Sequence, residues 1–556
     1  MDKGIVRGSL AGKTCLSAAS FAVVSAAVAL AGAAPAAVVR PAPRLLDLRV
    51  ANGSAPFAGD RRLLTTVTPN RDGRRDAATV SFRLTEPASV RMDVVRTDSV
   101  KRATPSAITI ATKRARFRPG RRRLVWRPPL DTPERTYVLR LTVTGAHGAR
   151  RVYGLTPLRP HAQVRAPVVR VLGISAAFSR RSYAPGDTAQ VSVATDARSL
   201  RFQVFSLAKV PHPTEEDLRT GGEAVTPPVT LDWRGHANAP GSIRVVRAGD
   251  WPSGLYFLRI TAGDGRIGYA PFILRSRRPG THKVAVVLST NTWQAYNFDD
   301  ANGDGWGDSW YVSAGFRTVD VRRPFLDFGV PFRFRDWDLT VVSWLTRTGK
   351  AVDYLSDDDL ARFRSGDELA RAYDLVVFPG HEEYVTQHAY DVVRRYRDVG
   401  GNLLFLSANN FFWKVVRRGP YLTRVAEWRR LGRPEAALVG VQFDAGDYGG
   451  RQGPFEVTGA ARDPWAFAGT GLADGDRFGS YGYEIDKRAP SSPRGTHVLA
   501  RIRNLMGPRR SAEMTYYETP RGAKVFAAGA LNFAASANVP VVSQLLENVW
   551  ARLSRP

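Results

Sequence analysis

Cysteine is nearly absent from the sequence, because Cys15 is the only one among 556 residues. Cys15 lies in a stretch with the parts of a secretory signal: basic residues near the start, an uncharged Ala-, Val- and Leu-rich run at 14–39, and small residues at its end. We therefore expect residues 1–39 to be a signal peptide or an N-terminal anchor, and the protein to be exported, either secreted or at the cell surface. If this segment is cleaved, the mature chain has no thiol, which excludes disulfides, cysteine-ligated zinc and a cysteine nucleophile.

Long hydrophobic runs are missing after the N-terminal segment. No later stretch has the ~18 consecutive apolar residues that predict a membrane-spanning helix, so we expect no membrane span beyond residues 1–39. The sequence also lacks a Ser-His-Asp arrangement, a phosphate-binding loop and a dinucleotide-binding fingerprint. Any chemistry must therefore depend on other residues.

Acidic residues are few relative to basic ones. The chain has 51 Asp and Glu against 80 Lys and Arg, and its net charge is +29. A basic total suggests nucleic-acid binding, but the arginines occur in every segment and no nucleic-acid-binding motif accompanies them. We predict a solvated, arginine-rich surface with weak attraction to anionic cell-envelope polymers, and no nucleic-acid partner.

Short runs of alternating polar and apolar residues dominate the first half of the chain. The alternation at 78–84, 90–95 and 137–143, with turn-forming residues between the runs, is typical of half-buried strands. Short strands at regular spacing predict β-sandwiches. We expect one all-β, immunoglobulin-like sandwich at 44–160 and a second at 166–277.

The segment 68–76 resembles the opening of immunoglobulin-like modules in exported bacterial proteins. Asn70, Asp72 and Asp76 offer oxygens that could bind Ca²⁺. A turn held by hydrogen bonds from these side chains to the backbone is the alternative, and we favour it.

After the second module, strand-like and helix-like stretches alternate. Apolar runs at 284–288, 375–378 and 402–406 are typical of buried strands, and 386–399 has the spacing of a helix. Alternating strands and helices predict an open parallel sheet, in which ligands bind beyond the carboxyl ends of the strands. We therefore expect an α/β domain at 282–556.

Two strand ends of this domain carry side chains suited to chemistry. The strand at 375–378 runs directly into Gly-His-Glu-Glu-Tyr at 380–384. A histidine titrates near neutral pH, and carboxylates bind metals or transfer protons, so His381 and Glu383 are candidates. A polar loop whose acids cap the following helix is the alternative. The next strand ends near Asn409, which could position a substrate or satisfy the backbone of a turn.

A loop rich in glycine and aspartate has oxygen ligands at alternating positions, namely Asp300, Asn302, Asp304 and Asp308. This spacing is typical of the front of an EF-hand calcium loop, but the twelfth position is Tyr311 instead of glutamate. We expect a weak structural Ca²⁺ site, and a turn without metal is the alternative.

These separate pieces together resemble one family. The chain from about 282 to 556 is similar to the C-terminal domain of the N,N-dimethylformamidase large (beta) subunit family, and the preceding module resembles the lead-in sandwich of that family. The matching stretches agree in order and rough spacing; they are Asn-Thr-Trp-Gln-Ala-Tyr-Asn at 291–297, Arg-Pro-Phe at 323–325, Gly-His-Glu-Glu-Tyr at 380–384, Ala-Asn at 408–409 with Trp413, Gly-Tyr-Glu-Ile-Asp at 482–486 and Gly-Ala-Lys-Val-Phe-Ala-Ala-Gly at 522–529.

The resemblance implies a fold like the class I glutamine amidotransferase domain, with a flavodoxin-like sheet. It also implies a mononuclear ferric iron held by two tyrosines and a glutamate, which would polarise an amide carbonyl or activate water. Carried over by position, Tyr296 and Glu383 would be metal ligands. His381 would be the nearby histidine, and Glu484 the further catalytic acid.

One position departs from the family pattern. The second ligand tyrosine of the family follows Arg-Pro, but here Arg323 and Pro324 are followed by Phe325, which has no oxygen to donate. Tyr384 or Tyr311 could take its place. The formamidase also uses a small partner subunit, and this chain gives no sign of one.

Two functions are compatible with these residues. The first is an exported hydrolase that cleaves a C–N (amide) bond with the help of a metal. The second is a non-catalytic cell-surface or extracellular protein that holds a small-molecule or cell-envelope ligand in the same pocket and with its β-sandwich modules. Phe325 favours the second function. Retention of the other four family positions favours the first; these are Tyr296, His381, Glu383 and Glu484. Asn297 and Asn409 are candidates for contacting the bound molecule, and neither the substrate nor the oligomeric state follows from the sequence.

Overall fold

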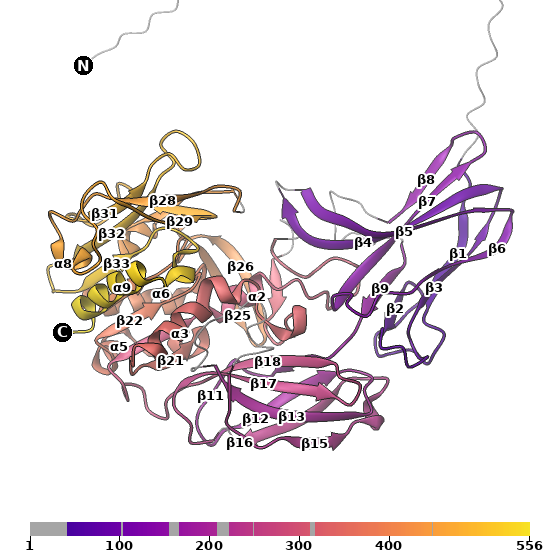
Figure 1. The fold of residues 1–556 in the computed structure, drawn as a ribbon, viewed down its shortest axis with the longest axis horizontal. Coiled ribbons are helices and arrows are strands. Elements are labelled where there is room, and N and C mark those ends of the chain that lie inside the picture. Colours follow the sequence, from indigo (N-terminus) through magenta and orange to yellow (C-terminus); the bar gives the residue numbers. More distant parts are fainter. Residues whose placement is uncertain are drawn as a thin grey trace, which may run out of the picture. The chain divides into compact units, whose positions relative to one another are not determined.

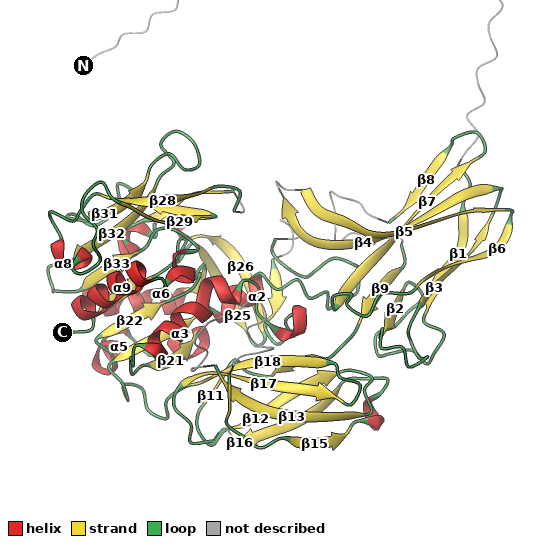
Figure 2. Ribbon diagram, in the orientation of Figure 1, coloured by secondary structure: helices red, strands yellow, loops and turns green. Residues whose placement is uncertain are grey.

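The computed structural model describes residues 42–101, 104–154, 166–207, 222–247, 249–311, 317–447 and 449–555. The predicted signal or anchor at 1–39 lies outside these residues. The described chain is multidomain and mostly β-sheet, with several sandwich-like sheets and some helices (Figure 1 and Figure 2). Within these ranges, no helix is both long and apolar enough to cross a membrane.

The first β-rich module contains nine strands: β1 (Leu45–Ala51), β2 (Leu64–Val67), β3 (Ala78–Leu84), β4 (Ala88–Lys101), β5 (Thr104–Phe117), β6 (Gly120–Trp126), β7 (Arg135–Gly145), β8 (Arg150–Tyr153) and β9 (Val168–Val171). They form two sheets, in the orders β1-β3-β6 and β2-β9-β7-β4-β5, and β8 pairs with β7. β3 alternates as predicted, because every second side chain from Ala78 to Leu84 is buried. The buried side chains of both sheets share one hydrophobic core.

The turn before β3 is held by the side-chain hydrogen bonds that we favoured over Ca²⁺. The Asp76 carboxylate accepts hydrogen bonds from the backbone N–H groups of Arg71 and Gly73, both at 2.8 Å. Asp72 accepts another from the N–H of Arg74, at 2.8 Å. These bonds satisfy the backbone of the turn locally.

The second β-rich module contains β10 (Ser175–Phe178), β11 (Ser182–Tyr183), β12 (Thr188–Ala194), β13 (Ser199–Ser206), β14 (Glu223–Ala224), β15 (Val229–Asp232), the short helix η1 (Arg234–His236), β16 (Gly241–Arg247), β17 (Gly254–Ala262) and β18 (Ile267–Leu274). One sheet has the order β10-β12-β16, and the other has β11-β18-β17-β13-β14 with β15 beside β13. Phe178 and Tyr256 both pack against Phe272 in the core. β9 lies within the range expected for this module, yet it pairs with β2 and β7 of the first module.

A nine-stranded sheet organises the C-terminal domain. Its strands are β19 (Val284–Leu288), β21 (Asp353–Ser356), β22 (Leu375–Phe378), β24 (Asn402–Phe405), β28 (Gln452–Val457), β29 (Arg477–Gly482), β31 (His497–Ile502), β32 (Ala512–Glu518) and β33 (Lys524–Ala527). The spatial order is β21-β19-β22-β24-β33-β32-β31-β28-β29. The first five strands are parallel to one another, and the remaining pairings are antiparallel.

Helices pack on both faces of the parallel strands; the main ones are α3 (Thr340–Arg347), α5 (Gly366–Ala372), α6 (Gln387–Asp398) and α9 (Pro540–Leu553). Successive strand side chains point to opposite faces. Val286 and Val377 therefore share a core with α3 and α9, whereas Ala285 and Val376 share a core with α5 and α6. α6 confirms the helix predicted at 386–399.

Shorter elements surround the strand ends: α2 (Thr290–Ala295), β20 (Thr318–Asp320), η2 (Asp327–Gly329), η3 (Arg335–Leu339), α4 (Asp357–Leu360), β23 (Tyr384–Thr386), β25 (Trp413–Arg418), β26 (Tyr421–Glu427), η4 (Trp428–Leu431), α7 (Ala436–Val439), β27 (Gln442–Gly446), α8 (Pro464–Phe467), β30 (Glu484–Lys487) and η5 (Phe533–Ser536). Two small sheets form among them, β20-β26-β25-β23 and β27-β30. β23 begins at Tyr384, the last residue of the 380–384 segment, and β30 begins at Glu484. Both strands therefore help to position the candidate site.

Candidate functional site

The predicted site residues lie beyond the carboxyl ends of adjacent parallel strands. Tyr296 follows β19 and α2, while His381 and Glu383 follow β22. Asn409 follows β24, the next strand in the sheet. Glu484 comes from a distant part of the chain, at the start of β30.

Four of these side chains converge. The Tyr296 hydroxyl donates a hydrogen bond to Oε2 of Glu383 at 3.1 Å, and its oxygen lies 3.2 Å from Nε2 of His381. His381 Nε2 lies 3.1 Å from Glu383 Oε2 and 3.7 Å from Glu484 Oε2. Tyr296, His381 and Glu383 are buried, whereas 22% of the Glu484 side chain is exposed.

Tyr311 joins this cluster. Its hydroxyl donates a hydrogen bond to Glu383 Oε2 at 2.8 Å, and its ring stacks on that of Tyr296 with centroids 4.0 Å apart. The hydroxyl oxygens of Tyr311 and Tyr384 are 2.5 Å apart. Two phenol oxygens, from Tyr296 and Tyr311, therefore meet one carboxylate oxygen of Glu383.

Phe325 has a different environment from these oxygens. Its ring packs against Trp293, and the Arg181 guanidinium lies 4.8 Å from its centre. Phe325 also lines a cavity of about 280 Å³ next to Tyr296. Most of its other lining residues are apolar, such as Phe298 and Phe332, and the polar ones are Asn297, Arg96 and Arg135. Phe325 therefore contributes an apolar wall to this cavity.

The orientation of the His381 ring is set by the backbone. Nδ1 lies 3.0 Å from the carbonyl oxygen of Ala408, so Nδ1 carries the hydrogen and Nε2 faces Glu383 and Tyr296. Burial lowers the pKa of His381, but its hydrogen bond with Glu383 and the charges of Glu383 and Glu484 outweigh this effect. The net result is a raised pKa, which favours the protonated ring.

The two stacked tyrosines are held as neutral phenols when no cation is present. Burial is the main reason that the pKa of Tyr296 and that of Tyr311 lie well above their ordinary value, and the charge of Glu383 adds to it. A nearby cation would reverse this preference, because it stabilises the phenolate.

Glu484 is positioned by a chain of hydrogen bonds. Asn409 donates from Nδ2 to Glu484 Oε2 at 2.8 Å. The Asn409 backbone has φ 55°, and its N–H donates to both carboxylate oxygens of Asp486, at 2.8 and 2.9 Å. Burial raises the pKa of Glu484 to about 7, although His381 acts in the opposite direction. The side chain that satisfies the backbone of this turn is that of Asn410, because its Nδ2 donates a hydrogen bond to the Ser407 carbonyl.

Asp486 contacts the cluster through Asn409, although we assigned it no role of its own within the 482–486 segment. It is buried, and burial raises its pKa to about 8. The only signal was its place in the Gly-Tyr-Glu-Ile-Asp segment at 482–486. Nothing in that pattern indicates that its carboxylate accepts hydrogen bonds from Asn409, which lies on another strand end.

The glutamates of the 380–384 loop do not cap the following helix. Thr386 caps α6, since its side chain accepts a hydrogen bond from the Ala389 N–H. Glu382 is buried and hydrogen-bonded to Asp357, and burial together with the charge of Asp357 holds the pKa of Glu382 well above its ordinary value. Only Glu383 joins the cluster.

Asn297 is not part of this cluster. Its Nδ2 donates to Gln294 Oε1 and to the Pro324 carbonyl, and its Oδ1 accepts from the Asp299 N–H. It lines the cavity beside Tyr296. These bonds hold the loop that follows α2.

The proposed calcium loop uses its oxygens on its own backbone. Asp300 accepts hydrogen bonds from the N–H groups of Gly303 and Gly305, both at 2.8 Å. Asp308 Oδ1 accepts from Asn302 Nδ2 at 2.8 Å. Asp304 accepts from the Trp306 N–H. Across the described ranges, no group of three or more His, Cys, Asp and Glu side chains is placed to hold a metal ion. The Ca²⁺ site stays a prediction.

Two curated relatives are N,N-dimethylformamidase beta subunits. The protein from Paracoccus aminophilus is 29% identical over 286 residues, which cover 43% of this chain and 36% of the relative. The protein from Alcaligenes sp is 31% identical over 141 residues, which cover 24% of this chain and 17% of the relative. The aligned part thus spans about a third of the Paracoccus relative and about a sixth of the Alcaligenes relative.

Solved structures give only remote likeness. Escherichia coli alpha-2-macroglobulin matches with a TM-score of 0.22 and 12% identity over 43% of this chain and 17% of that one. The Yersinia pseudotuberculosis adhesin InvE matches with a TM-score of 0.13 and 12% identity over 42% of this chain and 58% of that one. These scores support no conclusion about fold or function.

A protein-family match covers more than half of the chain. Residues 223–544 match the family described as N,N-dimethylformamidase beta subunit-like, C-terminal. The range includes the whole cluster around Glu383, and it confirms the resemblance drawn from the sequence motifs. The chain therefore belongs to the N,N-dimethylformamidase beta subunit-like family.

Proposed function

We propose that the protein is a metal-assisted amide hydrolase. The observation that carries this proposal is the meeting of three groups at Glu383 Oε2: the Tyr296 hydroxyl at 3.1 Å, the Tyr311 hydroxyl at 2.8 Å and His381 Nε2 at 3.1 Å. The two curated relatives are named dimethylformamidase subunits, so the expected target is the C–N bond of an amide.

The donor set fits a ferric ion. Phenolate and carboxylate oxygens are hard ligands that suit a hard cation, and Tyr296, Tyr311 and Glu383 present three such oxygens in one buried cluster. Bound there, iron would supply Lewis acidity toward an amide carbonyl or a water molecule. Tyr311 would provide the second phenolate oxygen, because Phe325 stands where the family pattern has a tyrosine and has no oxygen to donate.

The remaining groups of the cluster are suited to moving protons. Hydrolysis joins a water oxygen to the carbonyl carbon and breaks the C–N bond, and the proton lost by water is needed on the departing nitrogen. Glu484, with its pKa raised to about 7, is available in both protonation states near neutral pH. His381 Nε2, 3.7 Å from Glu484, stabilises the carboxylate form. Asn409 orients the Glu484 carboxylate through its Nδ2.

The cavity beside Tyr296 suggests a small substrate. Its volume of about 280 Å³ is at the low end for small-molecule pockets, and its walls include Phe298, Phe325 and Phe332. We propose that it receives a short amide with apolar substituents. Replacement of the family tyrosine by Phe325 makes this wall more apolar.

We also propose that the parallel half of the nine-stranded sheet is a flavodoxin-like fold, as in class I glutamine amidotransferases. If the five parallel strands are numbered along the chain, their order across the sheet is 2-1-3-4-5. This is the flavodoxin-like order. Ligands in such sheets bind where the strand order reverses, here between β19 and β22. Tyr296 follows β19, and His381 and Glu383 follow β22, so the cluster lies at this point.

Elemental analysis of the purified protein tests the metal proposal. We expect about one iron per chain and a visible tyrosinate-to-iron absorption band, with loss of both in Glu383→Ala. Glu456→Ala is a suitable control, because Glu456 pairs with arginines away from the cluster. Iron retained in Glu383→Ala, or amide hydrolysis by iron-free protein, would contradict the proposal.

A non-catalytic role is the alternative, and the apolar wall formed by Phe325 is the observation that favours it. In that case iron-loaded protein would bind short amides without releasing an amine. Amine release from N,N-dimethylformamide and related amides distinguishes the two functions. Export through residues 1–39 stays a prediction, which secretion of the full chain by its host would test.

A further inference from the structure

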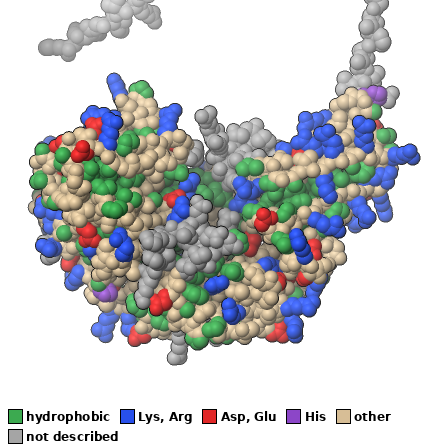
Figure 3. Space-filling model, viewed as in Figure 1, with side chains coloured by type: hydrophobic (Ala, Val, Ile, Leu, Met, Phe, Trp, Pro, Cys, Tyr) green, Lys and Arg blue, Asp and Glu red, His purple; other side chains and the backbone are tan. Residues whose placement is uncertain are grey.

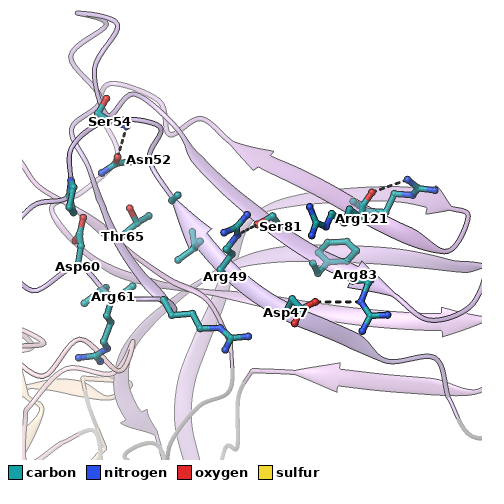
Figure 4. A pocket seen from close by; sticks show the side chains of 17 residues that line it. Asp47, Arg49, Asn52, Ser54, Asp60, Arg61, Thr65, Ser81, Arg83 and Arg121 are labelled. Carbon is teal, nitrogen blue, oxygen red and sulfur yellow. Dashed lines mark hydrogen bonds and ion pairs between the residues drawn. The ribbon is translucent and has the colours of Figure 1, made fainter.

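A large cavity lies away from the candidate site, on the first β-rich module. It has a volume of about 910 Å³ and is lined by strands β1, β3 and β6 together with the segment before and within β2 (Figure 4). Its charged residues are Asp47, Arg49, Asp60, Arg61, Arg62, Arg83, Arg121 and Arg122. We call these residues and their cavity the arginine pocket.

Six arginines but only two aspartates line the arginine pocket. Among the described residues, only Arg83 pairs with a carboxylate of the pocket, that of Asp47 at 3.4 Å, and both side chains are largely exposed. The Asp60 carboxylate pairs with no arginine among the described residues, and it accepts hydrogen bonds from the Phe57 N–H and the Thr66 hydroxyl. The pocket therefore has a surplus of uncompensated positive charge.

Neutral oxygens hold several of these guanidinium groups in place. Arg49 donates to the Ser81 hydroxyl at 3.0 Å (Figure 4). Arg62 donates to the Leu48 carbonyl at 3.0 Å, and Arg122 donates to three backbone carbonyls. These bonds orient Arg49, Arg62 and Arg122 without cancelling their charge, so an incoming anion would meet three guanidinium groups that are already ordered.

The strand register places like charges against each other. In the antiparallel pair β3 and β6, Arg83 lies directly opposite Arg121. Like charges at such positions destabilise a sheet, and an anion between them would remove this cost. Figure 3 shows many further Lys and Arg side chains over the part of the chain that carries β4 to β8, so the surrounding field also attracts anions.

We propose that the arginine pocket binds an acidic polysaccharide. Arginine forks match the geometry of carboxylates, and arginines on three neighbouring strands suit a chain that repeats its negative charges. The pocket is too large for a single inorganic anion. The only aromatic side chain that lines it, Phe82, is buried in the core. Single-stranded nucleic acids are typically held by exposed aromatic rings, so a nucleic acid is disfavoured.

The test measures binding of the full chain to polygalacturonate, with neutral dextran, polyphosphate and oligo-dT as comparison ligands. We expect affinity for polygalacturonate that falls as salt rises, no binding to dextran, and weaker binding to polyphosphate and oligo-dT. Tighter binding to oligo-dT or to polyphosphate, or equal binding to dextran, would overturn the proposal.

A triple variant, R49Q/R83Q/R121Q, tests the location. We expect it to lower the affinity for polygalacturonate by about tenfold or more, because each lost ion pair between an arginine and a carboxylate contributes about two- to fivefold. The matched control removes three exposed arginines of β5 and the turn after it, R114Q/R116Q/R118Q, and should change the affinity by less than about threefold. Equal losses in the two variants would show that overall charge, and not the pocket, is responsible.

A single variant guards against a folding defect. The side chain of Arg121 makes no hydrogen bond or ion pair among the described residues, so Arg121→Gln should leave thermal unfolding unchanged. It should still weaken polygalacturonate binding by about threefold. Unchanged affinity in this variant, with the fold intact, would count against the pocket.

Discussion

At the scale of single residues, the candidate site depends on a tyrosine that occupies an unexpected place in the sequence. The family pattern has a tyrosine after Arg-Pro, and this chain has Phe325 there. Tyr311, from the loop that follows the Asp- and Gly-rich segment, reaches Glu383 at 2.8 Å instead. The fold thus brings a phenol oxygen from another position to Glu383, where the proposed metal would need one.

Substitution of Tyr311 tests this replacement. We expect Tyr311→Phe to lose most of the bound iron and of the visible charge-transfer band, because one of three protein oxygens is removed. Tyr384→Phe is the matched control, since the Tyr384 hydroxyl is hydrogen-bonded to that of Tyr311 and, among the described residues, not to the Glu383 carboxylate. If Tyr384→Phe loses iron and Tyr311→Phe keeps it, the roles of the two tyrosines are reversed.

Asn409 offers a second test at this scale. Its hydrogen bond lowers the pKa of Glu484, which burial raises to about 7. Asn409→Ala should therefore raise this pKa further, and NMR titration of carboxyl-labelled glutamate, with Glu484→Gln for assignment, can measure it. An unchanged or lower pKa in Asn409→Ala would show that Asn409 does not stabilise the Glu484 carboxylate.

At the scale of elements, one buried arginine ties together the loops beside the site. Arg323 donates hydrogen bonds to the carbonyls of Asp320 and Gln294, at 3.1 and 2.8 Å. It also donates to the carbonyls of Asp299 and Asp308, both at 3.0 Å. The carbonyls of Gln294, Asp299 and Asp308 belong to α2 and to the chain that leads from Tyr296 toward Tyr311, so Arg323 helps to determine where Tyr311 lies.

Loss of this arginine should therefore affect both stability and metal binding. We expect Arg323→Met to lower the free energy of unfolding by about 2 kcal/mol, because buried carbonyls lose their donors. It should also weaken iron binding by displacing Tyr311. Denaturant unfolding and iron content measure the two effects. Arg322→Met is the control, because Arg322 is exposed and pairs with Asp320; an equal effect there would exclude a specific role for Arg323.

At the scale of the whole molecule, the second β-rich module contacts the C-terminal domain through Arg181. This buried side chain donates hydrogen bonds to the carbonyls of Val321 and Arg323, and its guanidinium packs over the Phe325 ring. Burial lowers its pKa to about 10. One side chain thus connects the module to the segment that carries the family-specific Arg-Pro-Phe.

Removal of this contact should loosen the connection. We expect Arg181→Met to lower the free energy of unfolding by about 2 kcal/mol, since two buried carbonyls lose a charged donor. Limited proteolysis of the segment between β18 and β19, at 275–283, should also become faster. The neighbouring Arg180→Met serves as control, because Arg180 is exposed and pairs with Asp187. Equal behaviour of the two variants would show that burial of Arg181 is unimportant.

Buried acids give the whole molecule a defined pH dependence. Burial raises the pKa of Asp300, Asp338 and Glu484 to about 7, and that of Asp486 to about 8. The folded state therefore holds these protons more tightly than the unfolded state, and stability should fall as pH rises from about 5 to about 8.

Asp486→Asn isolates one part of this effect. The variant keeps a neutral side chain at all pH values, so its loss of stability between about pH 5 and pH 8 should be smaller than that of the wild type. Urea unfolding at both pH values provides the comparison. An equal or larger loss in Asp486→Asn would mean that Asp486 is charged in the folded protein throughout this range.

The sequence by itself determined the features that depend on local patterns. Alternation at 78–84 and the helical spacing at 386–399 predicted β3 and α6, because a residue's burial in a strand or helix follows its own periodicity. His381 and Glu383 were found because a buried strand runs directly into them. The family, too, followed from short motifs whose order is readable along the chain.

Only the tertiary structure decided which distant side chains meet. Tyr311 and Glu383 are 72 positions apart, and their contact depends on the path of the loop that Arg323 holds. Asp486, Asn409 and Glu484 form their chain of hydrogen bonds because β30 approaches the end of β24. The arginine pocket likewise exists because three strands align arginines that are far apart in the sequence. Such contacts depend on the packing of whole elements, which no local pattern encodes.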